Sequence, residues 1–227
     1  MKILNRLTQF LSIFLEEQCP LCDRPASGGI VCPYCDRQLQ QAKFSNPKYR
    51  WQGDLPLFVW GSYGSILKRA IAKLKYDNQP QLGTWLGEQL GHSWRQHFPQ
   101  QPLVVIPIPM HPSKQQERGF NQAELISRQF AQVIRAPHAP QVLVRRKATQ
   151  ALFELNLQQR QREIANAFVL DAQAQRRLGD RPVLLIDDIY TSGTTAQEAY
   201  RVLQQGGVPV LGIAAIATPS PHAKISP

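Results

Sequence analysis

Residues 183–195 constrain the fold of this chain more than any other segment. Val183 to Ile186 are four consecutive apolar residues, which is typical of a strand buried on both faces of a parallel sheet. Two carboxylates, Asp187 and Asp188, follow where this strand would end, and a loop from Thr191 to Thr195 comes next. The segment therefore predicts a buried strand whose carboxyl end carries an acidic pair and a polar loop.

The residues after the loop complete an α/β unit. Ala196 to Gln205 has apolar residues at helical spacing, and Val208 to Ala217 is apolar enough to form the next strand. The loop would then lie at a helix N-terminus, where free backbone N–H groups and the helix dipole attract an anion. Its glycine allows a tight turn, and its hydroxyls can donate hydrogen bonds. These loop residues are Thr191, Ser192, Gly193, Thr194 and Thr195.

The residue types indicate which anion fits. The loop contains no lysine or arginine and lacks the Gly-Lys-Ser/Thr ending of a P-loop, so backbone N–H groups and hydroxyls would hold a phosphate. The carboxylates of Asp187 and Asp188 suit ribose hydroxyls or Mg²⁺, which prefers oxygen ligands. Together these features predict a ribose 5-phosphate site. The alternative is a strand end whose aspartates only cap the following turn.

At this point the chain resembles the type I phosphoribosyltransferases, whose signature is an apolar strand, two acidic residues and a Thr/Ser/Gly loop. The resemblance implies that Asp187 and Asp188 hold the ribose hydroxyls of 5-phosphoribosyl 1-diphosphate (PRPP), with Mg²⁺. It also implies that Thr191 through Thr195 hold the 5-phosphate. The fold expected is a type I phosphoribosyltransferase-like parallel sheet flanked by helices, with active-site loops at the carboxyl ends of the strands.

The four cysteines form two Cys-Pro-x-Cys pairs separated by nine residues. A two-residue gap lets both thiolates of a pair face one metal ion, and two pairs complete a tetrahedral zinc site. With all four ligand positions used, the predicted zinc is structural. Two disulfides or a redox pair are the alternatives, and disulfides would need an oxidising compartment. The predicted zinc ligands are Cys19, Cys22, Cys32 and Cys35.

A second anion-binding loop is predicted in the middle of the chain. Leu103 to Ile106 reads as a buried strand, and three prolines within six residues then fix an irregular turn. The stretch Arg118-Gly119-Phe120-Asn121 follows and leads into a helix. Its arginine, with Lys114, is a candidate partner for a pyrophosphate. The alternative is a pair of solvated cations in a surface loop.

The motifs in this region resemble those of the ComF family, bacterial phosphoribosyltransferase-like proteins with an N-terminal four-cysteine finger. The resemblance is carried by Pro107-Ile108-Pro109, by Arg118 to Ala123, and by Lys75-Tyr76-Asp77. It implies an association with natural competence and DNA uptake. By analogy, Arg145 to Gln150 is the mobile loop that closes over PRPP. The candidate pyrophosphate and lid residues are therefore Arg118, Gly119, Asn121, Arg145 and Lys147.

Two main classes of function follow. The first is a phosphoribosyltransferase with PRPP as donor, in which no general base is visible and His111 is expected to be structural. The second is a non-catalytic protein that senses PRPP or binds single-stranded DNA, which a net charge of +10 would favour. Its stacking aromatics would be Trp51, Trp60, Tyr63 and Trp85, although packing in the core is the expectation for them. A third option is a scaffold that binds competence-machinery proteins.

The sequence also predicts the domain organisation. Residues 1–45 would form an amphipathic helix and the zinc finger, residues 46–56 a linker, and residues 57–227 the phosphoribosyltransferase-like domain. Ile66 to Tyr76 is expected to be a helix whose basic face is either solvated or a wall over the ligand. The chain has no run of 18 apolar residues, so no membrane span is expected, and we expect the protein to be cytoplasmic.

Overall fold

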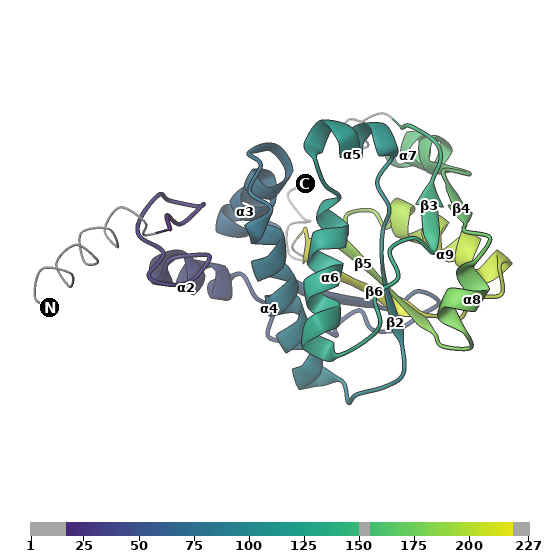
Figure 1. The fold of residues 1–227 in the computed structure, drawn as a ribbon, viewed down its shortest axis with the longest axis horizontal. Coiled ribbons are helices and arrows are strands. Elements are labelled where there is room, and N and C mark those ends of the chain that lie inside the picture. Colours follow the sequence, from purple (N-terminus) through teal and green to yellow (C-terminus); the bar gives the residue numbers. More distant parts are fainter. Residues whose placement is uncertain (1–16, 150–154, 220–227) are drawn as a thin grey trace, which may run out of the picture.

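The structure is a computed structural model, and it describes residues 17–149 and 155–219 (Figure 1). Its centre is a sheet of four parallel strands in the order β1-β6-β5-β2. The strands are β1 (Leu57–Ser62), β2 (Val104–Pro107), β5 (Val183–Ile189) and β6 (Val210–Thr218). The predicted parallel sheet flanked by helices is confirmed.

Both faces of the sheet are buried, as the unbroken apolar runs of its strands predict. Alternate residues of β5 supply the two faces: Leu184 and Ile186 face one hydrophobic cluster, and Val183 and Leu185 face the other. All four are fully buried. A strand buried on both faces cannot alternate apolar with polar residues. The apolar run of β5 therefore ends only at Asp187, near the carboxyl end of the strand.

Helices cover each face. On one side lie α3 (Ser65–Tyr76), α4 (Gln81–His97) and α6 (Gln122–Ile134), which share one core cluster with Phe58 and Trp60 of β1. On the other side α9 (Thr194–Gln205) packs with an antiparallel pair of strands, β3 (Leu143–Arg145) and β4 (Phe168–Leu170). The shorter helices are α2 (Pro33–Gln41), α5 (Pro112–Arg118), α7 (Leu157–Ile164) and α8 (Ala174–Leu178).

Helices α4 and α6 lie close together because α4 presents glycine to its neighbour. A Cβ on Gly87 would overlap the backbone carbonyl oxygen of Ile126 in α6. Any larger residue there would force the two helices apart and open the core beneath them. This tight layer holds α6, and the loop that leads into it, against the carboxyl end of β2.

Residues 43–50, which include part of the predicted linker, lie along the outer edge of β1. The amide of Phe44 donates to the carbonyl of Trp60, and the amide of Val59 donates to the carbonyl of Pro47. Short antiparallel bridges join Lys43 to Gly61 and Arg50 to Leu57. This segment thereby satisfies backbone groups that the edge strand would otherwise expose.

The predicted N-terminal amphipathic helix falls in residues 1–16 and so lies outside the described residues. Within the part of the chain that is described, no helix combines the length and the hydropathy needed to cross a membrane.

Candidate functional site at the carboxyl edge of the sheet

The predicted phosphate loop joins β5 to α9. Gly193 is the residue before α9 and adopts a left-handed conformation with φ of 76°. The amide groups of the first turn of a helix have no acceptor within the helix, so those following Gly193 are available to a ligand. The hydroxyls of Ser192 and Thr194 lie 2.8 Å apart and hydrogen bond to each other. The loop therefore has the donors that an anion needs.

Glycine is required at position 193 for two reasons. Its positive φ is one that residues with a Cβ rarely adopt. In addition, a Cβ there would overlap the phenol of Tyr190, which is buried beneath the loop. The carbonyl of Tyr190 accepts a hydrogen bond from the hydroxyl of Thr218 at 2.7 Å, which ties the base of the loop to the end of β6.

A small cavity of about 30 Å³, open to solvent, lies over this loop, and one of its walls comes from a different element. Arg160 of α7 lines it together with Asp187 and the loop residues 190–196. The Nε of Arg160 donates to the carbonyl of Leu155 at 2.8 Å, which fixes the guanidinium group. Sequence reasoning missed this residue because Arg160 lies more than thirty positions before the first residue of the loop, Thr191. The loop thus gains the cation that its own sequence lacks.

The second signature carboxylate, Asp188, is occupied by an ion pair. Its Oδ2 lies 2.7 Å from the Nζ of Lys75, the penultimate residue of α3, and both side chains are largely buried. Burial by itself would lower the pKa of Lys75, but the charge of Asp188 and the hydrogen bond to it outweigh burial, so the net pKa is raised. Lys75 belongs to the Lys75-Tyr76-Asp77 motif, but helical spacing alone does not distinguish it from Lys73, which pairs at the surface with Asp77 at 3.6 Å.

Asp187 is half-buried beside this pair, and its environment disfavours a second negative charge. Burial, and after it the charge of Asp188, raise the pKa of Asp187, while the Asp188 amide and Lys75 lower it, and the net pKa is about 8. The Oδ1 of Asp187 accepts the amide of Asp188 at 2.8 Å. Without a ligand, Asp187 therefore keeps its proton near neutral pH, and a cation or a diol brought to the site would favour the ionised form.

This pKa predicts how stability depends on pH. Because the folded protein holds the Asp187 proton up to about pH 8 and the unfolded chain releases it near pH 4, the Asp187 contribution to stability falls as pH rises between these values. Asp187→Asn is expected to remove this decline. From pH 5 to pH 8, the free energy of unfolding of the variant should therefore rise by roughly 1–3 kcal/mol relative to that of the wild type. Urea unfolding of both proteins at the two pH values measures it. An equal pH dependence for both would contradict the assignment.

The two lid candidates have different surroundings. Burial lowers the pKa of Arg145, while the charges of Asp187 and Glu163 act to raise it, so its guanidinium lies within electrostatic range of Asp187. Its Nε is buried without a hydrogen-bond partner among the described residues. Lys147 instead donates to the carbonyl of Glu163 at 2.8 Å, at the end of α7. Gln150, the last residue of the predicted mobile loop, lies outside the described residues.

The residues of the second predicted loop are placed between α5 and α6. Asn121 is buried and caps α6: its side chain accepts the amide of Ala123 and donates to the carbonyl of Ile108 at 3.1 Å. Gly119 ends α5 in a left-handed conformation with φ of 86°. Arg118 donates to Gln122 and lies over the ring of Tyr76. The structure therefore gives Asn121 and Gly119 clear roles in shaping the loop, and it leaves the Arg118 cation near the sheet edge.

His111 caps helix α5. Its Nδ1 accepts the amide of Ser113 at 3.2 Å and lies 2.7 Å from the hydroxyl of the same serine. This is the structural role that the sequence predicts for it. The three-proline turn differs from the expectation in one respect: Pro112 opens a helical segment, because proline is well tolerated in the first turn of a helix.

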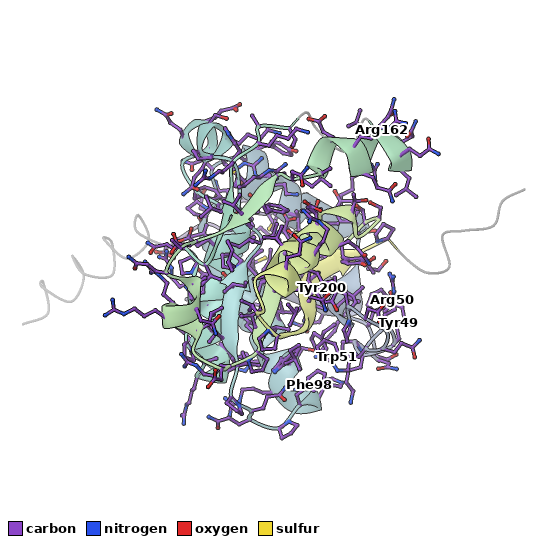
Figure 2. The ribbon with its side chains drawn as sticks, turned by 90° about the vertical axis from the view of Figure 1, so that its right-hand side faces the viewer. Tyr49, Arg50, Trp51, Phe98, Arg162 and Tyr200 are labelled. Atoms are coloured by element: carbon purple, nitrogen blue, oxygen red, sulfur yellow. The ribbon has the colours of Figure 1, made fainter. Side chains whose placement is uncertain are left out.

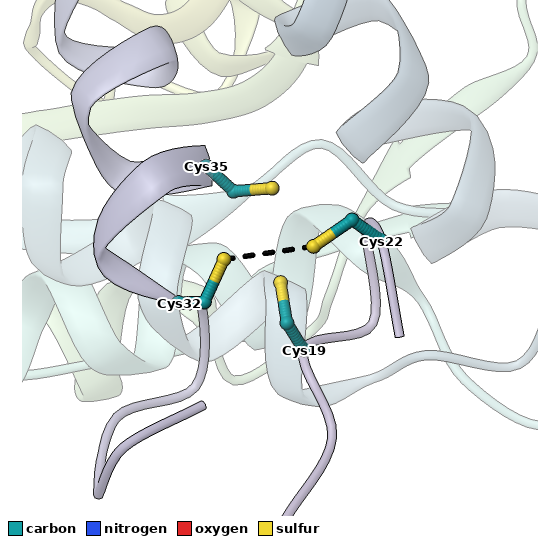
Figure 3. A group of neighbouring side chains, drawn as sticks. All are labelled: Cys19, Cys22, Cys32 and Cys35. Atoms are coloured by element: carbon teal, nitrogen blue, oxygen red, sulfur yellow. Dashed lines mark hydrogen bonds between the residues drawn. The ribbon is translucent and has the colours of Figure 1, made fainter. Parts of the chain in front are cut away.

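The four cysteines converge on one point, as Figure 3 shows. Their sulfur atoms all lie within 4.8 Å of one another, and the sulfurs of Cys22 and Cys32 are 3.5 Å apart. Zn–S bonds of about 2.3 Å place tetrahedral ligands at roughly 3.8 Å separations, whereas a disulfide needs about 2.05 Å. The four thiols are free, so the cluster can hold a metal ion such as zinc. The donor set and spacing fit that metal.

Of the four aromatic residues considered for stacking on single-stranded DNA, Trp60 and Trp85 are buried, and Trp51 and Tyr63 are partly buried. Trp60 and Trp85 are almost fully buried and meet edge to face with ring centroids 6.2 Å apart. Trp51 packs on Phe98 with centroids 4.8 Å apart, in the region labelled in Figure 2. Tyr63 is partly buried against the same core. The prediction that these residues pack in the core is therefore confirmed for Trp60 and Trp85, whose rings are not exposed for stacking on a base.

Fold and site together define a class: a parallel α/β protein with an acidic pair and a hydroxyl loop at the carboxyl ends of its strands, joined to a four-cysteine cluster.

Known proteins match this chain over most of its length. It is 27% identical to Competence protein F of Haemophilus influenzae over 203 residues, covering 84% of this chain and 85% of that protein. It is 23% identical to Competence protein ComFC of Bacillus subtilis, covering 83% and 72%. It is 26% identical to DNA utilization protein YhgH of Escherichia coli O157:H7, covering 83% and 78%. The resemblance to the ComF family is thus confirmed.

Comparison with solved structures gives weaker likenesses. A hypoxanthine phosphoribosyltransferase from Staphylococcus aureus is 17% identical, with coverage of 65% of this chain and 70% of that one and a TM-score of 0.35. An adenine phosphoribosyltransferase from Trypanosoma brucei is 10% identical, with coverage of 81% and 67% and a TM-score of 0.38. Overall likenesses at these scores carry no weight. No protein-family model matches the chain.

Proposed function

We propose that this protein binds PRPP or a related ribose 5-phosphate compound at the loop between β5 and α9. The observation that carries the proposal is the meeting of three features at one cavity: the hydroxyl loop, the carboxylate of Asp187 and the guanidinium of Arg160. The amides after Gly193 and the Arg160 cation would hold the 5-phosphate. Asp187 and Asp188 would hold the ribose hydroxyls.

Mg²⁺ suits the oxygen donors at this edge. Asp187 lines the cavity and would offer its carboxylate to a cation or a hydroxyl, while Lys75 already neutralises Asp188. The bound cation would neutralise charge on the pyrophosphate of the donor. Arg145 is within electrostatic range of Asp187 and would act on the same group, and Arg118 would approach from the α5–α6 side.

The reaction supported best is phosphoribosyl transfer. The bond between C1 of the ribose and the pyrophosphate oxygen breaks and takes its electron pair to the pyrophosphate. A nucleophile on the acceptor then bonds to C1 and releases its proton to water. The chain would contribute positioning and cations that stabilise the departing charge. An acceptor screen with PRPP and Mg²⁺ tests this activity by the release of pyrophosphate.

The binding role can be tested at Arg160 without assuming catalysis. Arg160→Ala is expected to weaken ribose 5-phosphate binding about 10-fold, because it removes a charge-assisted contact to the phosphate. Arg162 lies on the same helix but is exposed outside the cavity, so Arg162→Ala is a matched control and should change affinity by less than about twofold. Figure 2 labels Arg162 on α7. Isothermal titration calorimetry measures both variants, and equal losses would contradict a specific role for Arg160.

The names of the relatives support a place in competence or in DNA utilization, and we propose such a role for this protein in DNA uptake. A net charge of +10 favours contact with nucleic acid or with other polyanions. A non-catalytic PRPP sensor or single-stranded DNA-binding protein is the second candidate. That candidate predicts ligand binding without pyrophosphate release, so the acceptor screen separates the two. The four cysteines form no disulfide, and thiols stay reduced in a reducing compartment, so we propose that the protein acts in one such as the cytoplasm.

A further inference from the structure

A second cavity lies at the edge of the sheet opposite the phosphate loop. Helices α4 and α6 both end beside it, and Leu103, which leads into β2, forms part of its lining. Its volume is about 240 Å³, below the roughly 300–1,000 Å³ of sites for drug-sized ligands, so it suits a smaller molecule. The described residues that line it all differ from those that line the cavity over the phosphate loop. It is therefore a separate candidate site.

One wall of this cavity is apolar. Trp94 and Phe98 stack at the end of α4 with ring centroids 4.2 Å apart, and both line the cavity. Trp94 is buried, whereas Phe98, labelled in Figure 2, is partly exposed. Val133 and Ile134 of α6 are lining residues too. An apolar group placed here would leave water and pack against an aromatic ring, which stabilises binding.

Two arginines bring positive charge to the same cavity. Arg95 belongs to the last turn of α4, and Arg135 follows the last residue of α6. Both are exposed, and within the described residues neither guanidinium forms an ion pair with a carboxylate. A guanidinium offers a planar fork of N–H donors that matches a carboxylate. The two arginines can therefore hold the acid group of a ligand whose apolar part lies on the wall.

The ends of the two helices supply acceptors beside these cations. The last carbonyl groups of a helix have no donor within it, and they point toward its C-terminus. Proline follows four residues after Arg95 and four residues after Val133, and a proline has no N–H to donate to them. Both of these residues line the cavity. Two backbone carbonyls thus lose their helical partner and can accept hydrogen bonds from a ligand.

An ammonium group already lies at one of these helix ends. The Nζ of Lys48 donates to the carbonyl of His97, the last residue of α4, at 3.5 Å, and it lies 5.3 Å from the centroid of the Phe98 ring. The negative end of the helix dipole favours such a cation. The same field disfavours a phosphate dianion, which would also leave the apolar wall uncovered. The cavity therefore suits a ligand that carries one carboxylate, one ammonium and an apolar group.

We propose that this cavity binds a free apolar α-amino acid. The carboxylate pairs with Arg95 and Arg135, the ammonium donates to the helix-end carbonyls, and the apolar side chain packs on Phe98. The inference goes beyond the proposed function and does not depend on it, because the two cavities share no lining residue. It gives the protein a second ligand, of a chemical class unrelated to sugar phosphates.

The test titrates the full chain with three probes: L-phenylalanine, 3-phenylpropionate, which lacks the ammonium, and 2-phenylethylamine, which lacks the carboxylate. Saturation-transfer NMR, which detects weak binding, gives the affinities. The wild type is expected to bind L-phenylalanine at least about 10-fold more tightly than either analogue, because each analogue loses a charge-assisted hydrogen bond. An analogue that binds as tightly as L-phenylalanine, or no saturable binding of L-phenylalanine, overturns the proposal.

A variant pair locates the binding. Arg135→Ala is expected to weaken L-phenylalanine binding about 10-fold and to leave ribose 5-phosphate affinity unchanged. Arg176 is an exposed arginine of α8 outside this cavity, so Arg176→Ala is the matched control and should change the affinity by less than about twofold. Equal losses in the two variants would show that only net charge matters and would overturn the assignment. If ribose 5-phosphate fails to bind the wild type, the proposed function falls while this inference stands.

Discussion

Replacing Asp187 and Asp188 together by asparagine is expected to weaken PRPP binding at least about 100-fold, because each carboxylate supplies charge-assisted hydrogen bonds to the ribose or to its cation. The site depends on these two groups more than on any single loop residue, since the loop acts through several donors at once. Calorimetric titration of PRPP with Mg²⁺ measures the loss. An affinity within about threefold of the wild type would show that the acidic pair does not hold the donor.

Two controls keep this result interpretable. Asp188→Asn leaves the buried Lys75 ammonium without its partner, which can destabilise the fold, so Asp187→Asn alone should also be measured. That variant keeps the ion pair and is expected to lose at least about 10-fold in affinity. The pair Asp54→Asn and Asp180→Asn changes the net charge equally at two exposed positions. It should bind PRPP as the wild type does.

The second large effect is expected at the cysteine cluster. Cys35 is fully buried and belongs to the same core cluster as Leu39 of α2 and Leu67 of α3. If four thiolates hold zinc, Cys35→Ser should eliminate the bound metal and lower the thermal midpoint by roughly 5–15 °C, because the binding free energy of a structural metal stabilises the fold. Metal analysis and calorimetric melting give the two readouts.

A chelator provides the matched comparison for this prediction. Prolonged treatment of the wild type should lower its thermal midpoint toward that of Cys35→Ser, whereas the same treatment should leave the metal-free variant unchanged. A reduced wild-type protein that contains almost no zinc and melts at the same temperature as Cys35→Ser would remove the metal from this account. Loss of phosphate-site binding is not expected in either case.

The sequence predicts the local parts of this molecule well. The apolar run of β5, the helix after Gly193 and the paired cysteines all follow from spacing along the chain, since strand and helix periods and metal-ligand gaps are local properties. The same holds for the helix from Ser65 to Tyr76, which the apolar spacing places within one residue of its observed start.

The contacts between distant segments could not be predicted in this way. Lys75 meets Asp188 across more than a hundred positions, and neither helical spacing nor its motif shows that Lys75 pairs with Asp188 while Lys73 pairs with Asp77 at the surface. Arg160 reaches the loop only because α7 folds over the start of α9. The raised pKa of Asp187 likewise needs the burial and the neighbouring charge that only the assembled sheet edge supplies.

The most direct test of the central claim is a crystal structure of the protein with PRPP and Mg²⁺. We expect the 5-phosphate to lie about 3 Å from the backbone amides that follow Gly193, with the ribose hydroxyls on Asp187 and Asp188 and the Arg160 guanidinium turned toward the phosphate. Density for the donor elsewhere on the protein, with the loop empty and the Lys75–Asp188 pair undisturbed, would contradict the account.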